Sequence, residues 1–210
     1  MATKADICNL ALAQLGDSAT VTSINPPDGS PQAGNCARWW PIALRQVTEA
    51  FDWSFLTRRE KLAKLSTIDE EVYGWKYSFN VPSDCVRIIK LERKTPCGWM
   101  ETLPFEVENN PSNSSRMILC CEEDPILSYV ALNDNPSLYP SYFVACLVPL
   151  LASLLVGPLK RADSMTQVAQ NLRAEYAQAL SAAKTLDAKN SVHKRRQPLR
   201  IPPHMRVREV

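Results

Sequence analysis

Residues 140–159, PSYFVACLVPLLASLLVGPL, decide the fold of this chain. From Ser137 to Val156 the residues are apolar on every side of a helical projection, which predicts a central helix buried by its neighbours. Within it the run from Tyr142 to Val156, the one most like a membrane span, is expected to be too short for one and contains Pro149 and Ser153, so a buried helix is favoured over a membrane helix. Gly157-Pro158 is expected to end it.

Two helices are predicted before residue 55. The first has Thr3 and Asp6 as a capping box and Gly16 just after its end. Its apolar stripe consists of Cys8, Ala11, Leu12 and Leu15. The second begins with Ser30 as N-cap and Pro31 in the first turn, and Pro41 should kink it. Its packing seam consists of Ala33, Ala37, Trp40, Leu44, Val47 and Phe51.

A last helix is predicted over about residues 163–188, half exposed to water. Its buried face should consist of Met165, Val168, Leu172, Tyr176, Ala179, Ala183 and Leu186. Between the helices the period changes to two, as Tyr77, Phe79 and Val81 alternate. The runs VRIIKL, RMILCC and ILSYVAL are rich in β-branched residues and separated by turn-forming clusters, which predicts a small antiparallel sheet.

The fold class is therefore α+β, mainly α. We expect an antiparallel helical bundle from residues 1–54 and 137–188, a β-rich insertion over residues 55–136, and an extended basic C-terminal arm over residues 189–210. The arm holds seven Lys or Arg and one acid, a net charge of +6. Because the whole chain carries +2, the preceding residues are acidic, with a net charge of −4. This asymmetry points to an electrostatic role for the arm.

Basic and apolar residues are interleaved in the arm, a pattern typical of a strand added to the edge of another sheet or a peptide in an acidic groove. A solvated terminus without function and simple contact with DNA are the alternatives. The residues that we expect to bind a partner are Lys194, Arg195, Arg196, Leu199, Arg200, Ile201, Met205, Arg206, Val207 and Arg208.

Catalytic residues, cofactor sites and metal sites are not expected. Both histidines, His193 and His204, lie in the arm, where no rigid scaffold orients them. No phosphate-binding glycine loop occurs. The cysteines lack zinc-site spacing and are expected to be free thiols of a reducing compartment, without a secretory signal before them. The acidic run Glu122 to Asp124 is expected to form a solvated turn, and Trp39 to be exposed or packed on the inserted sheet.

Several motifs resemble, in order and spacing, the tail tubular protein A family, the head-to-tail adaptors of short-tailed bacteriophages. The resemblance covers about residues 1–188 and is carried by ICNLALAQLGDSATVTSINPPDGSPQA, FDWSFLTRREKLA, GWKYSFNVPSDCVRIIKLE, LPFEVE and PSYFVACLVPLLASLLVGPL. Pro41 and Pro149 depart from regular helical sequence, and no arm motif can be matched to the family.

The resemblance implies a structural virion protein of the phage neck, assembled in the host cytoplasm, with no enzymatic activity. It implies twelve copies in a ring on the portal protein, a tail nozzle protein of the tail tubular B kind docked below, and DNA passing through the lumen without sequence-specific binding. It also implies that the C-terminal segment grips the portal. The alternatives are a DNA-binding protein with a basic tail and a peptidoglycan hydrolase of the tail, with Glu49, Glu60 and Glu106 as nominal acids.

Overall fold

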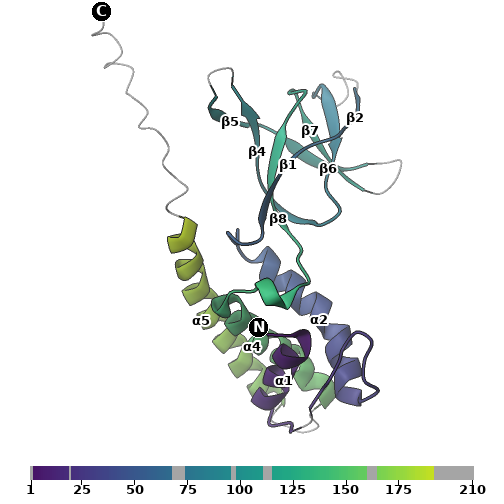
Figure 1. Cartoon of the computed structure of the whole chain (residues 1–210), viewed down its shortest axis with the longest axis vertical. Coiled ribbons are helices and arrows are strands. Elements are labelled where there is room, and N and C mark those ends of the chain that lie inside the picture. Colours follow the sequence, from purple (N-terminus) through teal and green to yellow (C-terminus); the bar gives the residue numbers. More distant parts are fainter. Residues whose placement is uncertain are drawn as a thin grey trace, which may run out of the picture.

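The computed structural model describes residues 2–18, 20–67, 74–95, 98–110, 115–159 and 165–191. Figure 1 shows a helical bundle at one end of an elongated molecule and a β-rich insertion at the other. The predicted fold class, α+β and mainly α, is confirmed. The chain enters the insertion after α2 and returns to the bundle before α4.

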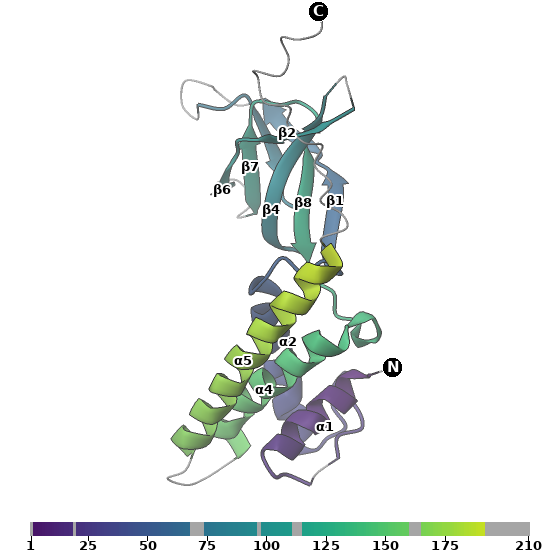
Figure 2. The same ribbon diagram turned by 90° about the vertical axis from the view of Figure 1, so that its left-hand side faces the viewer.

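The described part of the bundle contains α1 (Lys4–Gln14), α2 (Pro31–Glu49), α4 (Ser141–Leu159) and α5 (Met165–Ser191). The apolar helix α4 packs against all three others, which explains why its sequence is apolar all round. Figure 2 shows α4 and α5 lying antiparallel along most of their lengths. The central position predicted for this helix is confirmed.

The starts of α1 and α2 follow their capping signals. Thr3 and Asp6 form both hydrogen bonds of a capping box, and the Ser30 hydroxyl accepts from the Ala33 amide. Gly16 follows α1 with φ of 70°, a conformation that favours glycine. The seam of α2 faces the core, and the helix continues through Pro41 without interruption.

The predicted bounds of the apolar helix are wrong at both ends. Residues Pro136–Leu138 form a separate 3-10 turn, η1, and α4 begins only at Ser141, after Pro140. At the other end α4 continues through Pro158 to Leu159. A proline disfavours helix in the residue before it partly through a clash with that residue's Cβ, and Gly157 has none.

The insertion forms two four-stranded antiparallel sheets rather than the single sheet predicted. Their strand orders are β1-β8-β4-β5 and β2-β3-β7-β6. The strands are β1 (Thr57–Lys61), β2 (Lys64–Thr67), β3 (Tyr77–Asn80), β4 (Cys85–Lys94), β5 (Met100–Leu103), β6 (Glu106–Asn109), β7 (Arg116–Cys120) and β8 (Ile126–Ala131).

The apolar runs in the sequence correspond to the interior strands of both sheets. The alternation around Phe79 is β3, and the three β-branched runs are β4, β7 and β8. All four edge strands, β1, β2, β5 and β6, were missed. Edge strands carry polar and charged residues that limit pairing with other chains, so they lack the apolar alternation that predicts a strand.

Two apolar cores stabilise the molecule. The larger one fills the bundle around Trp53, which is fully buried, packs edge-on against Phe143 and donates its indole hydrogen to the Val47 carbonyl. The smaller one lies in the insertion around Phe79 and Ile118. Six cysteines lie in the described residues and all are free thiols, as predicted for them.

Candidate interaction surfaces

The predicted partner-binding residues, from Lys194 to Arg208, all lie outside the described residues, as do both histidines. The boundary of the arm is corrected, because α5 continues to Ser191 and so includes Lys189 and Asn190. Twenty-seven residues of α5 therefore precede the arm. The last turns of this helix fix the point from which the arm leaves the body.

Asp187 holds the C-terminal end of α5 in place. Its carboxylate accepts hydrogen bonds from the Ser54 amide at 2.8 Å, the Ser54 hydroxyl at 2.9 Å and the Tyr142 hydroxyl at 2.8 Å. Only 1% of Asp187 is exposed. Burial and the neighbouring carboxylate raise the pKa of Tyr142 to about 12, so this tyrosine remains a donor at neutral pH.

The prediction that Leu186 lies on this buried face of α5 is wrong. Leu186 is 48% exposed, whereas the adjacent Asp187 takes the inward position. Asp187 lies four residues after the buried Ala183, a spacing that keeps both on one side of a helix. The helical period is therefore compatible with a buried residue 187. An aspartate without an evident partner in the sequence is nevertheless expected at the surface, because carboxylates are seldom buried without partners.

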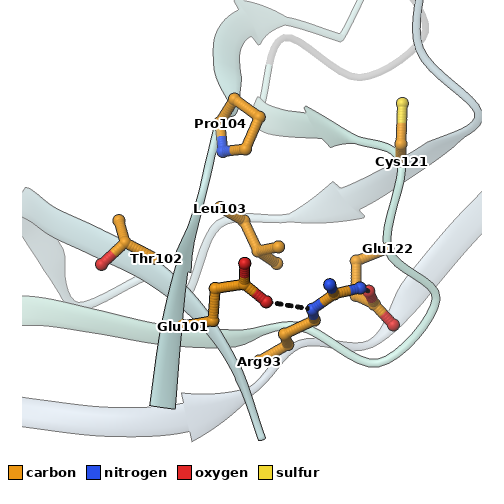
Figure 3. A pocket seen from close by; sticks show the side chains of 7 residues that line it. All are labelled: Arg93, Glu101, Thr102, Leu103, Pro104, Cys121 and Glu122. Carbon is orange, nitrogen blue, oxygen red and sulfur yellow. Dashed lines mark hydrogen bonds and ion pairs between the residues drawn. The ribbon is translucent and has the colours of Figure 1, made fainter. Parts of the chain in front are cut away.

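A hollow of about 250 Å³ lies on the insertion beside edge strand β5. Figure 3 shows Arg93 between two carboxylates, with its Nε donating to Glu101 at 2.9 Å and an Nη donating to Glu122 at 2.8 Å. Both bonds raise the pKa of Arg93, which stays charged at any ordinary pH. Leu103, Pro104 and the exposed thiol of Cys121 complete the rim. The guanidinium therefore joins β5 to the turn after β7.

The acidic run of residues 122–124 forms a turn held by cations from other strands. Glu122 pairs with Arg93, Glu123 with Lys64 at 3.2 Å, and Asp124 with Lys61 at 2.8 Å. Glu123 and Asp124 have more than half of their side chains exposed. The run is a solvated turn, as expected, and no group of three potential metal ligands gathers within the described ranges.

The three carboxylates considered for a hydrolase have separate partners. Glu49 closes α2 and pairs with Arg45 at 2.9 Å. Glu60 on β1 accepts from the Tyr129 hydroxyl, whereas Glu106 on β6 accepts from the Trp75 indole. Because β1 and β6 belong to different sheets, these acids do not form one cleft with paired carboxylates.

Trp39 packs against the helical bundle rather than on the inserted sheet, so that expectation was wrong. It is partly buried and lines a hollow of about 460 Å³ with residues of α4 and α5, including Leu154, Met165, Ala169 and Arg173. Trp39 and Trp40 are adjacent in α2, so their side chains point about 100° apart. Trp40 lies in the core seam, and residues of α4 and α5 also surround the side of α2 to which Trp39 points.

Two buried thiols from different helices are close together. Cys8 of α1 and Cys36 of α2 share a hydrogen bond, and this bond together with burial raises the pKa of Cys8. Burial alone raises the pKa of Cys146 in α4 to about 11. Protonated thiols in these positions act as small apolar groups of the core.

No family model matches the chain, and no curated protein matches it either.

Proposed function

We propose that this chain is a structural virion protein, the head-to-tail adaptor of a short-tailed bacteriophage. In this proposal twelve copies form a ring on the portal protein, extend the DNA channel and dock the tail nozzle protein below. The chain acts by binding proteins and catalyses no reaction. The ordered motifs of residues 1–188 support the proposal by resemblance, and the arm supports it by physical argument.

The observation that carries the proposal is the anchored end of α5. Asp187 binds Ser54 and Tyr142, so the helix that precedes the arm is fixed to the bundle and to the segment that leads into β1. Figures 1 and 2 show this end of α5 at the junction between bundle and insertion. A basic arm that starts from a fixed point is suited to reach a second protein.

Twelve arms in one ring bind a partner ring with a higher overall affinity than a single arm would. An arm that becomes ordered on docking loses conformational entropy, which lowers affinity for a given contact area. When twelve arms of one ring meet twelve equivalent grooves, each docking event raises the effective concentration of the next. In this proposal the affinity for the portal comes from the number of arms in the ring. The specificity comes from each arm, whose basic residues require an acidic groove.

The charges of the body favour this function over DNA binding. Eight cations of the described residues already pair with carboxylates, namely Lys4, Arg45, Arg58, Lys61, Lys64, Arg87, Lys90 and Arg93. Phosphates bind unpaired basic surfaces and are repelled by acidic ones. An acidic body would line a channel through which DNA slides without being held.

The test mixes the full chain with the portal ring encoded in the same phage genome and measures complex mass by sedimentation. A complex of twelve subunits with twelve supports the proposal, and no complex overturns it. The arm is tested with a charge-reversed variant, Arg195→Glu with Arg196→Glu and Arg200→Glu. We expect at least a tenfold loss of portal affinity, because several charge-assisted contacts become repulsive. Unchanged affinity would contradict the role of the arm.

The alternatives have their own measurements. A DNA-binding protein would show binding to random duplex that weakens steeply as salt rises, with a slope set by the phosphates it neutralises. A hydrolase would clear peptidoglycan in a zymogram. We expect neither result for the full chain.

A further inference from the structure

The insertion exposes four edge strands, and they differ in charge. Edge strand β1 carries three basic residues, two of which already pair with Asp84 and Asp124. Edge strand β2 carries Lys64, and the only acid of β5, Glu101, pairs with Arg93. Strand β6, Glu-Val-Glu-Asn, differs from β1 and β2 because it contains no base, and from β5 because it contains two acids, neither of which pairs with a cation of the described residues.

The acids of β6 have no cationic partner in the part of the chain that the structure describes. Glu106 accepts only the neutral indole hydrogen of Trp75, at 3.1 Å, and Glu108 makes no hydrogen bond or ion pair there. A row of unpaired backbone N–H and C=O groups accompanies them, because among the described strands β6 has a neighbour, β7, on one side only.

Between these acids Val107 remains 40% exposed. It lies opposite Ile118 of β7, whose side chain is fully buried in the core of the insertion. Glu106 and Glu108 lie opposite Leu119 and Met117, on the other face of the sheet. Leu119 and Met117 are themselves buried, whereas Glu106 is exposed and Glu108 half-buried. An added strand would therefore meet Val107 on the face of Ile118 and the two carboxylates on the opposite face.

The arm contains the complementary triplet Arg206-Val207-Arg208. In an extended strand both arginines point to one face and the valine to the other. With Val207 opposite Val107, each arginine faces a glutamate whether the added strand runs parallel or antiparallel, because both triplets are symmetric. The edge β1 is less suitable, since Arg59 and Lys61 share one face and would both oppose the arginines, and the other face offers only Glu60 beside Arg58.

We propose that residues 205–208 of the chain add as a strand to the free edge of β6 in the same molecule. The arm can reach this edge. Asp187 holds the end of α5 beside Ser54, three residues before β1 begins. Residues 192–204 can span about 45 Å when extended. The longest strand of the insertion, β4, has ten residues and is about 33 Å long.

This docking does not depend on the adaptor function. It would sequester the arm of a free molecule until a partner offers a better groove, so it also predicts competition with that partner. Intramolecular addition is favoured because the linking residues keep the arm at high effective concentration near β6.

A cysteine pair tests the register in the full chain. Val107→Cys and Val207→Cys are introduced after Cys121→Ser removes the exposed thiol and Cys97→Ser removes the one that lies outside the described residues. Under mild oxidation we expect a disulfide within one molecule, seen as a monomer of altered mobility on a non-reducing gel. The matched control pairs Val107→Cys with Arg206→Cys, which lies on the opposite face, and should cross-link at least about tenfold more slowly.

Charge exchange tests the chemistry. In the cross-linking background, Glu106→Arg with Glu108→Arg should slow disulfide formation about fivefold, because two attractions become repulsions. Adding Arg206→Glu and Arg208→Glu to that variant should restore the rate. Arg59→Glu, on the distant edge β1, should leave it unchanged.

Amide hydrogen exchange of β6 tests the docking with substitutions in the arm alone, so that residues 1–191 keep their sequence. In the Arg206→Glu, Arg208→Glu variant the outward-facing amides of β6 should exchange faster than in the wild-type chain, while β3 and β7 remain unchanged. Equal exchange in both proteins, equal cross-linking by the two cysteine pairs, or a cross-link that joins two molecules would each overturn the proposal.

Discussion

Replacing Asp187 with Asn should lower the free energy of unfolding by about 2–3 kcal/mol. The buried carboxylate accepts three hydrogen bonds through both oxygens, and an amide has only one acceptor oxygen, so it cannot accept from the Ser54 amide and from the two hydroxyls at once. Urea unfolding at pH 7 measures the change. Leu186→Asn, at the exposed neighbouring position, is the matched control and should change the free energy by less than about 0.5 kcal/mol. Equal effects would contradict the inward placement of Asp187.

Tyr142 should make stability fall at high pH. Its pKa is raised from 10 to about 12 in the folded protein, so its contribution is fully present below pH 10 and is lost as pH rises from 10 through 12. Unfolding of the wild-type chain and Tyr142→Phe is compared at pH 9 and pH 11.5. Other tyrosines titrate in both proteins, so the prediction concerns the difference between them, which should shrink at the higher pH. A constant difference would contradict the assignment.

Predictions for single residues were confirmed where the residue caps a helix, because a cap depends only on its neighbours in the sequence. Thr3, Ser30 and Gly16 lie where their capping chemistry requires them. Asp187 was missed because its partners, Ser54 and Tyr142, are remote in sequence, and only the fold brings them to the last turn of α5. The arm's proposed contacts remain predictions.

At the scale of elements, Ser30→Ala should destabilise α2 by about 1 kcal/mol, because the Ala33 amide loses its side-chain acceptor. Ser30→Gly is the matched control. It should cost only a few tenths of a kcal/mol, since glycine suits the N-cap backbone. Chemical denaturation of the three proteins measures both values. The same cost for both substitutions would contradict capping by the hydroxyl.

The sequence predicted the elements that are surrounded by other elements on both sides and missed the strands at the edges of the two sheets. The helix α4 is surrounded by other helices, so its apolar composition revealed its place before its bounds were known. The interior strands β3, β4, β7 and β8 appeared as apolar runs, whereas the charged edges β1 and β6 did not. A sequence of mixed charge gives no period of two, and backbone pairing across the sheet is a tertiary property.

At the scale of the whole molecule, the two cores should respond to mutation separately. Ile118→Ala opens a cavity in the insertion and should cost about 2–5 kcal/mol there. Amides of β3, β7 and β8 should then exchange faster than those of α4, because local unfolding follows contiguous cooperative units. Leu147→Ala, in the bundle core, is the matched control and should give the reverse pattern. Equal loss of protection in both halves would show one cooperative unit instead.

The position of Asp187 also determines how the molecule carries mechanical load. A pull on the arm enters the body at the end of α5, four residues beyond the carboxylate that binds Ser54 and Tyr142. One of these residues belongs to α4 and the other leads into β1, so tension is divided between both halves of the protein. The seam between α4 and α5 is thereby shielded from peeling, because peeling can begin only after the carboxylate has been detached.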